Sequence, residues 1–407
     1  MSALGKLLVL DVSRVLAGPY CGQFFADHGA EVIKIESPEG DHNRHWPILV
    51  NGASTNFFAV NRNKQDLVLD LRQPEGRAIL HALARKADVL IHNYLPETAR
   101  RLGVDDAQLE ALNANLVRVV VGGYGAKGPL AAKPGYDAMV AGFSGLMALT
   151  GEPDRPPVRL GSSVIDLATG MLAYGAAMTA LYARAEGRAK GQRVNVSLLE
   201  TAVALLGFRA TNYLMAGVVD RREGASFGSL APYGCYRAGD GEMMIAAPTQ
   251  AAWGKLCEVL GTRHWLDDPR FTDNDRRCAN EPALRAALEA VLAGRSIAEW
   301  SALLDAAGVA NAPVHTVDRA LDHPQVRAND MVVSARSSDG REHRLTGLPF
   351  KLSATPGEIR AAPPELGEHS AAVLARHLGY TEAEIAALRA KGVIERLAPA
   401  GGQGREE

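Results

Sequence analysis

The sequence contains few cysteines and no excess of charge of either sign. Four cysteines in 407 residues share no spacing typical of a metal site, and so few in a long chain indicate a reducing compartment. Forty-four basic and 46 acidic residues leave a formal charge of -2. This balance excludes the broad basic surface by which proteins bind nucleic acids or anionic membranes. An anionic ligand would need a local cluster of cations.

The sequence is also expected to lack a targeting signal and a membrane-spanning segment. Residues 1–6 lead directly into a strand pattern, without the basic and then apolar segments of a signal peptide. The most apolar stretch, 138–149, contains Gly142 and Gly145 and is too short to cross a bilayer. We therefore expect a soluble, cytoplasmic protein with no membrane partner.

The first 125 residues alternate strand and helix patterns, which predicts an α/β fold with a parallel sheet covered on both faces, Rossmann-like in outline. No Gly-x-Gly-x-x-Gly follows the first strand, and no P-loop sequence is present, so neither a dinucleotide site nor a P-loop is expected. The expected strands are 7–11, 31–36, 67–71, 89–92 and 116–121, and the expected helices are 19–28, 74–86 and 105–113.

The rest of the chain predicts a second, smaller α+β domain inside the first. A strand at 191–196 and a helix opened by the capping box Ser197–Glu200 continue the large domain. The predicted organisation is a large domain over 1–212, a linker at 213–229, a small domain at 230–315, a linker and C-terminal part of the large domain at 316–396, and a disordered tail at 397–407.

One carboxylate, Asp166, stands at the start of a long apolar helix predicted from Leu167 to about Ala185. As an N-cap it would accept hydrogen bonds from the free N–H groups of the first helical turn. As a catalytic group it would act at the mouth of a cleft. Residue patterns alone leave both interpretations open.

Several segments in order make the chain resemble the class III CoA-transferases, the family of formyl-CoA transferase and carnitine CoA-transferase. The resemblance extends to about Val393. It implies a CoA-binding large domain, a small domain and an interlocked homodimer. The matching segments include Val15–Pro19, Gly29–Glu36, Asn61–Lys64, Leu67–Leu71, Pro74–Gly76, Ala87–Asn93, Pro134–Asp137, Arg159–Gly170, Gly191–Val196, Pro313–Val314, His323–Gln325 and Leu366–His369.

The resemblance also implies site residues. The catalytic aspartate of the family falls on Asp166. We expect Arg72, Arg101 and Lys133 to bind the phosphates of CoA, and Tyr94 and Tyr136 to pack on its adenine. The predicted CoA-binding positions are Val15, Leu16, Leu69, Arg72, Tyr94, Arg101, Lys133 and Tyr136.

The implied reaction needs neither a metal nor a tightly bound cofactor, because acyl-CoA and a small carboxylic acid are its substrates. Ionised Asp166, with an ordinary pKa near ~3.9, would attack the thioester and form first an anhydride and then an enzyme-bound CoA thioester. N–H groups at a helix N-terminus beginning at Leu167 would stabilise the oxyanions.

Leu16 replaces the glutamine of formyl-CoA transferases, so we expect succinyl-CoA or another dicarboxylyl-CoA as donor rather than formyl or oxalyl thioesters. Two alternatives remain open. An α-methylacyl-CoA racemase would need a histidine where this chain has Tyr136, and tyrosine is a poor partner for two-base proton transfer. A non-catalytic acyl-CoA-binding protein would have no need of Asp166.

Overall fold

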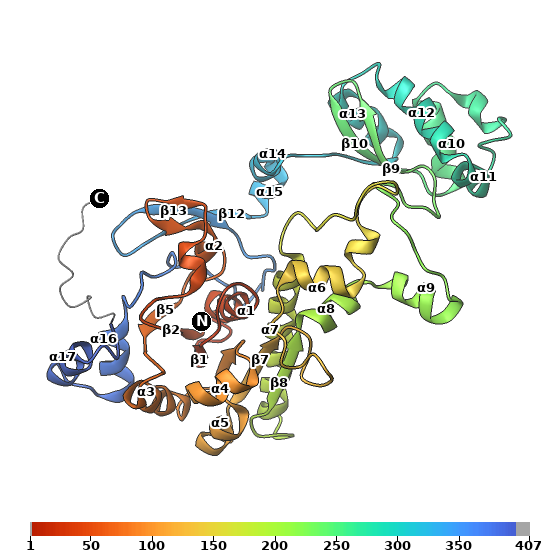
Figure 1. Ribbon diagram of the computed structural model, residues 1–407. Coiled ribbons are helices and arrows are strands. Elements are labelled where there is room, and N and C mark those ends of the chain that lie inside the picture. The colour runs from red at the N-terminus through yellow and green to blue at the C-terminus, as the bar shows by residue number, and fades with distance from the viewer. Residues whose placement is uncertain (1, 396–407) are drawn as a thin grey trace, which may run out of the picture. The chain divides into compact units, whose positions relative to one another are not determined.

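The computed structural model describes residues 2–395, which form two compact units (Figure 1). The first unit combines residues 2–146, 160–210 and 325–395, and the second combines 147–159 and 211–324. Each unit has its own buried apolar core. The tail expected at 397–407 lies outside the described residues.

The first unit is built on a six-stranded sheet in which every neighbouring pair of strands is parallel, which confirms the α/β prediction. Counted along the chain, its strands lie in the order 3-2-1-4-5-6, the order of doubly wound sheets that bind ligands where the winding reverses. From edge to edge they are β5 (Gln65–Val68), β2 (Glu31–Glu36), β1 (Leu8–Asp11), β6 (Val89–His92), β7 (Val117–Gly122) and β8 (Arg193–Ser197).

Helices cover both faces of this sheet (Figure 1). On one face α1 and α7 pack against each other and against the strands. On the other face alternate strand residues such as Leu8 and Leu10 join a core with Ile79 and Leu80 of α3. The helices of the unit are α1 (Ala17–Asp27), α2 (Thr55–Phe58), α3 (Pro74–Ala84), α4 (Pro96–Leu102), α5 (Asp106–Leu112), α6 (Asp137–Ser144), α7 (Val164–Ala185), α8 (Leu198–Leu205), α15 (Pro324–Ala328), α16 (Ser370–Val373) and α17 (Glu382–Ala390).

Most elements of the sheet lie within two residues of their predicted bounds, and β2 and β6 lie at them. The expected strand at 67–71 is wrong at both ends, because β5 is Gln65–Val68. The reason for its early end is that the N–H of Asp70 donates to the carbonyl of Val393 (2.7 Å), so the chain leaves the sheet to bind the C-terminal segment. Helix α4 and the hairpin of β3 (Leu49–Val50) and β4 (Ala53–Ser54) were not predicted.

Helix α7 is, among the described residues, the one helix long and apolar enough to cross a membrane by those criteria alone. Its packing against α1, α8, β7 and β8 gives it a place in the core of the first unit. Gly170 makes this packing possible, because a Cβ there would lie 2.6 Å from the carbonyl oxygen of Ala17.

The second unit is a three-stranded antiparallel sheet packed with helices. Its core is rich in aromatic side chains, including the stacked rings of Trp253 and Trp265. The helix α9 (Phe208–Ala216) runs from the first unit into this one. Its other elements are β9 (Tyr233–Ala238), β10 (Gly241–Ala246), α10 (Gln250–Val259), α11 (Asn274–Ala279), α12 (Glu281–Leu292), α13 (Ile297–Ala307), β11 (Ala310–Pro313) and α14 (Val317–Asp322).

The C-terminal segment returns to the first unit through the hairpin of β12 (Val332–Arg336) and β13 (Glu342–Thr346). It then binds the outer strand of the sheet. The hydroxyl of Ser370 accepts from the N–H of Val68 (3.1 Å), and the N–H of His369 donates to the carbonyl of Asp66 (3.0 Å). These bonds satisfy backbone groups that an open sheet edge would leave unpaired.

Buried ion pairs join the segment before β5 to β1 and to α1. The ammonium of Lys64 lies 2.7 Å from the Asp11 carboxylate, and the guanidinium of Arg62 lies 2.7 Å from Asp27. The Lys64 ammonium also donates to the carbonyl of Pro19 (2.7 Å). Lys64 and Asp11 are both fully buried, so each charge depends on its partner for the solvation that water would otherwise supply.

We therefore predict that Lys64→Met lowers the free energy of unfolding by about 3–5 kcal/mol, because it leaves the Asp11 carboxylate buried without its partner. Urea denaturation followed by circular dichroism measures this change. The matched control is Lys391→Met, whose ion pair with Glu75 is exposed and should change stability little. Equal losses in the two variants would contradict the role given to the buried pair.

Candidate active site

A cavity of about 590 Å³ opens at the carboxyl edge of the parallel sheet. The segments that follow β1, β6 and β7 line it, together with part of β8. Strands β1 and β6 are the neighbours at which the winding of the sheet reverses. A cavity of this size and place is typical of a ligand site in a doubly wound sheet.

Asp166 lines this cavity, but it is not the N-cap of its helix. Helix α7 begins at Val164 and its N-cap is Ser163, so Asp166 lies within the first turn and the predicted start at Leu167 is wrong. The helix extends further because another carboxylate binds its first N–H groups. Oδ2 of Asp137 accepts from the N–H of Ile165 (2.9 Å) and from that of Asp166 (3.2 Å).

This arrangement also corrects the expected source of oxyanion stabilisation. The N–H of Leu167 donates to the carbonyl of Ser163 (3.1 Å), and the next two N–H groups toward the N-terminus donate to Asp137. The first turn of α7 therefore has no free donor at these three positions. Asp137 itself begins α6, so its carboxylate joins two helices beside the cavity.

The half-buried Asp166 side chain is less acidic than an ordinary aspartate. Burial, and then the negative charge of Asp137, raise the pKa of Asp166 to about 7. The sequence-based expectation of an ordinary pKa is therefore wrong. Near neutral pH both the protonated and the ionised forms of Asp166 are present, and the ionised form is a stronger base than an exposed carboxylate.

The cavity brings together Asp166 and four of the eight predicted CoA-binding residues: Val15, Leu16, Tyr94 and Tyr136. Val15 and Leu16 follow β1, and Tyr94 follows β6. Tyr136 immediately precedes α6 and is exposed. Burial raises the pKa of the Tyr94 phenol, which keeps it neutral.

The other four predicted residues do not line the cavity. Leu69 is buried in the apolar core of the first unit. Arg72 is bound to Asp70 (2.7 Å) and Glu39 (3.1 Å). Lys133 lies with its ammonium 5.3 Å from the centroid of the Tyr124 ring, and Arg101 is an exposed residue in the last turn of α4.

Three other arginines line the cavity: Arg14, Arg100 and Arg193. The guanidinium carbon of Arg14 lies 5.0 Å from the centroid of the Tyr94 ring, and Nε of Arg193 donates to Oδ1 of Asn195 (2.8 Å). Sequence reasoning singled out neither Arg14 nor Arg193. A signal existed for Arg14, which stands three residues after a buried strand, where ligand-binding loops begin in such folds.

The cavity thus combines a basic carboxylate, cations suited to phosphates, and aromatic rings. His92 also lines it. Burial, and then the charge of Arg193, lower the pKa of His92 to about 4, so its imidazole is neutral at pH 7. Among the described residues no group of three or more histidine, cysteine or acidic side chains is arranged to hold a metal ion.

Proteins that are similar to this chain in sequence are named as CoA-transferases. The family model for CoA-transferase family III matches residues 4–370. The succinyl-CoA:glutarate CoA-transferase of Mus musculus is 34% identical over 398 residues, 97% of this chain and 91% of that protein. The acetyl-CoA:oxalate CoA-transferase of Acetobacter aceti is 36% identical over 371 residues, 90% of this chain and 94% of that protein.

A solved structure agrees with these matches. The crystal structure of a CAIB/BAIF family protein from Brucella suis has a TM-score of 0.85 and 35% sequence identity, and covers 92% of this chain and 99% of that one. The predicted resemblance is confirmed. The chain belongs to CoA-transferase family III and is a CoA-transferase.

Proposed function

We propose that this enzyme moves CoA from succinyl-CoA, or another dicarboxylyl-CoA, to a free dicarboxylic acid through covalent intermediates on Asp166. The observation that carries this proposal is the Asp166 carboxylate, half-buried at the cavity and with its pKa raised to about 7. A carboxylate that has lost hydration is a better nucleophile than one in water.

The reaction would proceed in two halves. A carboxylate oxygen of Asp166 attacks the thioester carbon and the C–S bond breaks. CoA leaves as a thiolate, and a mixed anhydride between Asp166 and the donor acyl group remains. The thiolate then attacks the aspartyl carbonyl, the donor acid leaves, and Asp166 becomes a CoA thioester. The acceptor carboxylate attacks this thioester and expels the thiolate. Finally the thiolate attacks the acceptor carbonyl, which releases Asp166 and the new acyl-CoA.

Binding of CoA in the cavity would use the cations and rings that line it. We assign the phosphates to Arg14, Arg100 and Arg193, because guanidinium groups form charge-assisted hydrogen bonds with phosphate oxygens. Tyr94 and Tyr136 offer flat surfaces for adenine. Leu69, Arg72, Arg101 and Lys133 remain predictions that the cavity lining does not support.

The choice of substrates rests on the relatives and on Leu16. The mouse relative is named for succinyl-CoA and glutarate, and the bacterial one for acetyl-CoA and oxalate. An apolar Leu16 at the cavity offers no hydrogen bond to a small polar acyl group such as formyl or oxalyl. We therefore favour a dicarboxylyl-CoA donor.

We further propose that the chain forms an interlocked homodimer in the cytoplasm, with a CoA-binding large domain over 1–212 and 316–396 and a small domain at 230–315. Exposed apolar side chains on α6, α7 and α8 support an interface, because a monomer rarely exposes so many in one region. These side chains are Met139, Phe143, Met171, Leu172, Tyr182, Val203 and Leu205.

The proposed function predicts that the enzyme exchanges isotope-labelled succinate into succinyl-CoA, and that Asp166→Asn abolishes the exchange while CoA still binds. Mass spectrometry of the thioester pool measures the exchange, and calorimetry measures CoA binding. Wild-type enzyme quenched with hydroxylamine during turnover should carry a hydroxamate at Asp166.

The raised pKa of Asp166 also predicts an effect on stability. At pH 8 the ionised Asp166 side chain destabilises the fold, because burial disfavours its charge. Asp166→Asn, which is neutral, should therefore not lower the melting temperature at pH 8.

Other results would overturn this assignment. Exchange of the α-hydrogen of an acyl-CoA with deuterated water, in the absence of an acceptor acid, would favour a racemase. CoA binding without transfer to any dicarboxylate would favour an acyl-CoA-binding protein. Substantial turnover by Asp166→Asn would remove the carboxylate from the mechanism.

The raised pKa predicts the pH dependence of transfer. Only ionised Asp166 attacks, so kcat/KM for the acyl-CoA should rise with pH through about 7, and at pH 6 it should be about tenfold below its plateau. Asp137→Asn removes the like charge and lowers the pKa of Asp166. The rise of kcat/KM with pH should therefore occur at lower pH in this variant. Asp339→Asn, in an exposed turn, is the control. If kcat/KM rises at the same pH in Asp137→Asn as in the wild-type enzyme, the proposed interaction is contradicted.

The dimer proposal predicts a particle of twice the 43.3 kDa chain mass. Light scattering coupled to gel filtration measures this mass, which should persist on dilution because interlocked chains separate only by unfolding. Leu172→Glu, which places a charge on the exposed apolar surface, should reduce the dimer fraction or the yield of folded protein. A wild-type mass of one chain would contradict the dimer.

A further inference from the structure

The loop between β1 and α1, residues 13–16, contains a residue in an unfavourable backbone conformation. Val15 has a φ angle of +71°, in the left-handed region. A β-branched side chain rarely adopts this conformation, because its Cβ substituents collide with the neighbouring backbone. Such a residue persists only where the surrounding structure imposes its conformation.

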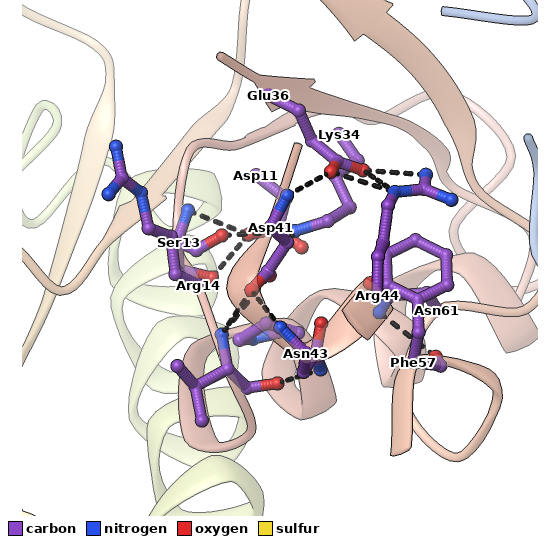
Figure 2. A network of polar contacts seen from close by, with 12 residues as sticks. Asp11, Ser13, Arg14, Lys34, Glu36, Asp41, Asn43, Arg44, Phe57 and Asn61 are labelled. Carbon is purple, nitrogen blue, oxygen red and sulfur yellow. Dashed lines mark hydrogen bonds and ion pairs between the residues drawn. The ribbon is translucent and has the colours of Figure 1, made fainter. Parts of the chain in front are cut away.

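Two side chains bind the backbone of Val15 directly. Its N–H donates to both oxygens of the Asp41 carboxylate (3.2 and 3.1 Å), and its carbonyl accepts from Nδ2 of Asn43 (2.6 Å). Both polar backbone groups of this residue are therefore held by the segment that follows β2. Figure 2 shows Asp41 and Asn43 side by side within the polar network.

The neighbouring residues of the loop are held in the same way. The N–H of Arg14 donates to Oδ1 of Asn93 (3.0 Å), and its carbonyl accepts from Nδ2 of the same residue (2.8 Å). The ammonium of Lys34 donates to the carbonyl of Ser13 (3.0 Å) and forms an ion pair with Asp41 (3.2 Å). Side chains thus replace the strand ladder that ends before this loop.

The side chains that hold the loop are buried, so water cannot replace their hydrogen bonds to the backbone. Asp41 is 2% exposed, and Asn43 is fully buried. Oδ1 of Asn43 has no hydrogen-bond partner among the described protein atoms. Loss of the Asn43 amide would leave the carbonyl of Val15 without this partner.

The loop held in this way forms one wall of the active-site cavity. Arg14, Val15, Leu16 and Ala17 all line it, and Asp166 lines it too. A change of Val15 to negative φ would redirect the chain on both sides, and would move Arg14 and Leu16 away from their places in the wall. The left-handed conformation therefore sets which groups face the ligand.

We infer that Asp41 and Asn43 are positioning residues for acyl-CoA: they hold Val15 in the left-handed conformation and so present Arg14 and Leu16 to the ligand. The inference rests on the proposed use of this cavity for CoA. Neither Asp41 nor Asn43 lines the cavity. We therefore expect them to affect the binding of CoA rather than the chemistry at Asp166.

The first test is Asn43→Ala in the full-length enzyme. We expect the dissociation constant of CoA, measured by calorimetry, and KM for succinyl-CoA to rise about tenfold, while kcat stays within about twofold. The matched control is Asn113→Ala. Asn113 is partly buried and also donates from Nδ2 to backbone carbonyls, those of Ala84 (3.0 Å) and Ala87 (3.0 Å), but it does not line the cavity. Asn113→Ala should leave CoA affinity unchanged.

The second test is a double-mutant cycle with Val15→Gly. Glycine adopts positive φ without steric cost, so residue 15 then depends less on Asp41 and Asn43 for its conformation. In the Val15→Gly background, Asn43→Ala should weaken CoA binding by about threefold or less, against about tenfold in the wild-type background. A residue that only stabilises the fold would cause the same loss in both backgrounds. If Asn43→Ala does not fold, Asn43→Ser takes its place in the cycle.

Equal losses in the two backgrounds would overturn the inference, and so would an Asn43→Ala variant that binds CoA as tightly as the Asn113→Ala control does. Because CoA affinity is measured without turnover, a failure of the proposed function gives a different result. In that case no label from succinate enters the thioester pool with any variant, whatever the double-mutant cycle shows.

Discussion

The carboxylate of Asp137 is the interaction on which the arrangement of the active site depends. It binds the N–H groups of Ile165 and Asp166 and so joins the start of α6 to the start of α7. A free helix N-terminus favours an ionised carboxylate and lowers its pKa. Here a second carboxylate occupies that position, and its charge, added to burial, raises the pKa of Asp166 instead.

The same edge of the sheet shows how a doubly wound fold can form a ligand cavity without a glycine-rich loop. In dinucleotide-binding folds, glycines let the backbone turn sharply after the first strand. This chain places Val15 at the turn, where buried Asp41 and Asn43 from the segment after β2 hold it. Asn93, which follows β6, holds the neighbouring Arg14. The ion pair of Lys64 and Asp11 lies at the end of that first strand, so the layer that stabilises the fold also supports the cavity wall.

Sequence patterns predicted the sheet well, because buried parallel strands are continuous apolar runs, and they placed Asp166 at the start of its helix to within one turn. They could not show that Asp137 caps that helix, since the two residues are 29 positions apart. They assigned phosphates to Arg72 and Lys133, which contact Asp70 and Tyr124 instead. Charge alone does not reveal whether an arginine already has a partner in the folded chain. Arg62 and Lys64 likewise have partners, in buried ion pairs with Asp27 and Asp11.

The raised pKa of Asp166 has opposite effects on stability and on reactivity. A folded-state pKa above the ordinary value means that the folded chain holds the Asp166 proton more tightly. The contribution of this one group to stability is therefore greatest below about pH 4 and declines until the pH exceeds about 7. At neutral pH the site therefore holds a carboxylate at some cost to the fold. In the proposed mechanism acylation would remove this charge and its cost, since an anhydride or a thioester is neutral. Burial would then favour the proposed covalent intermediates over the free anion.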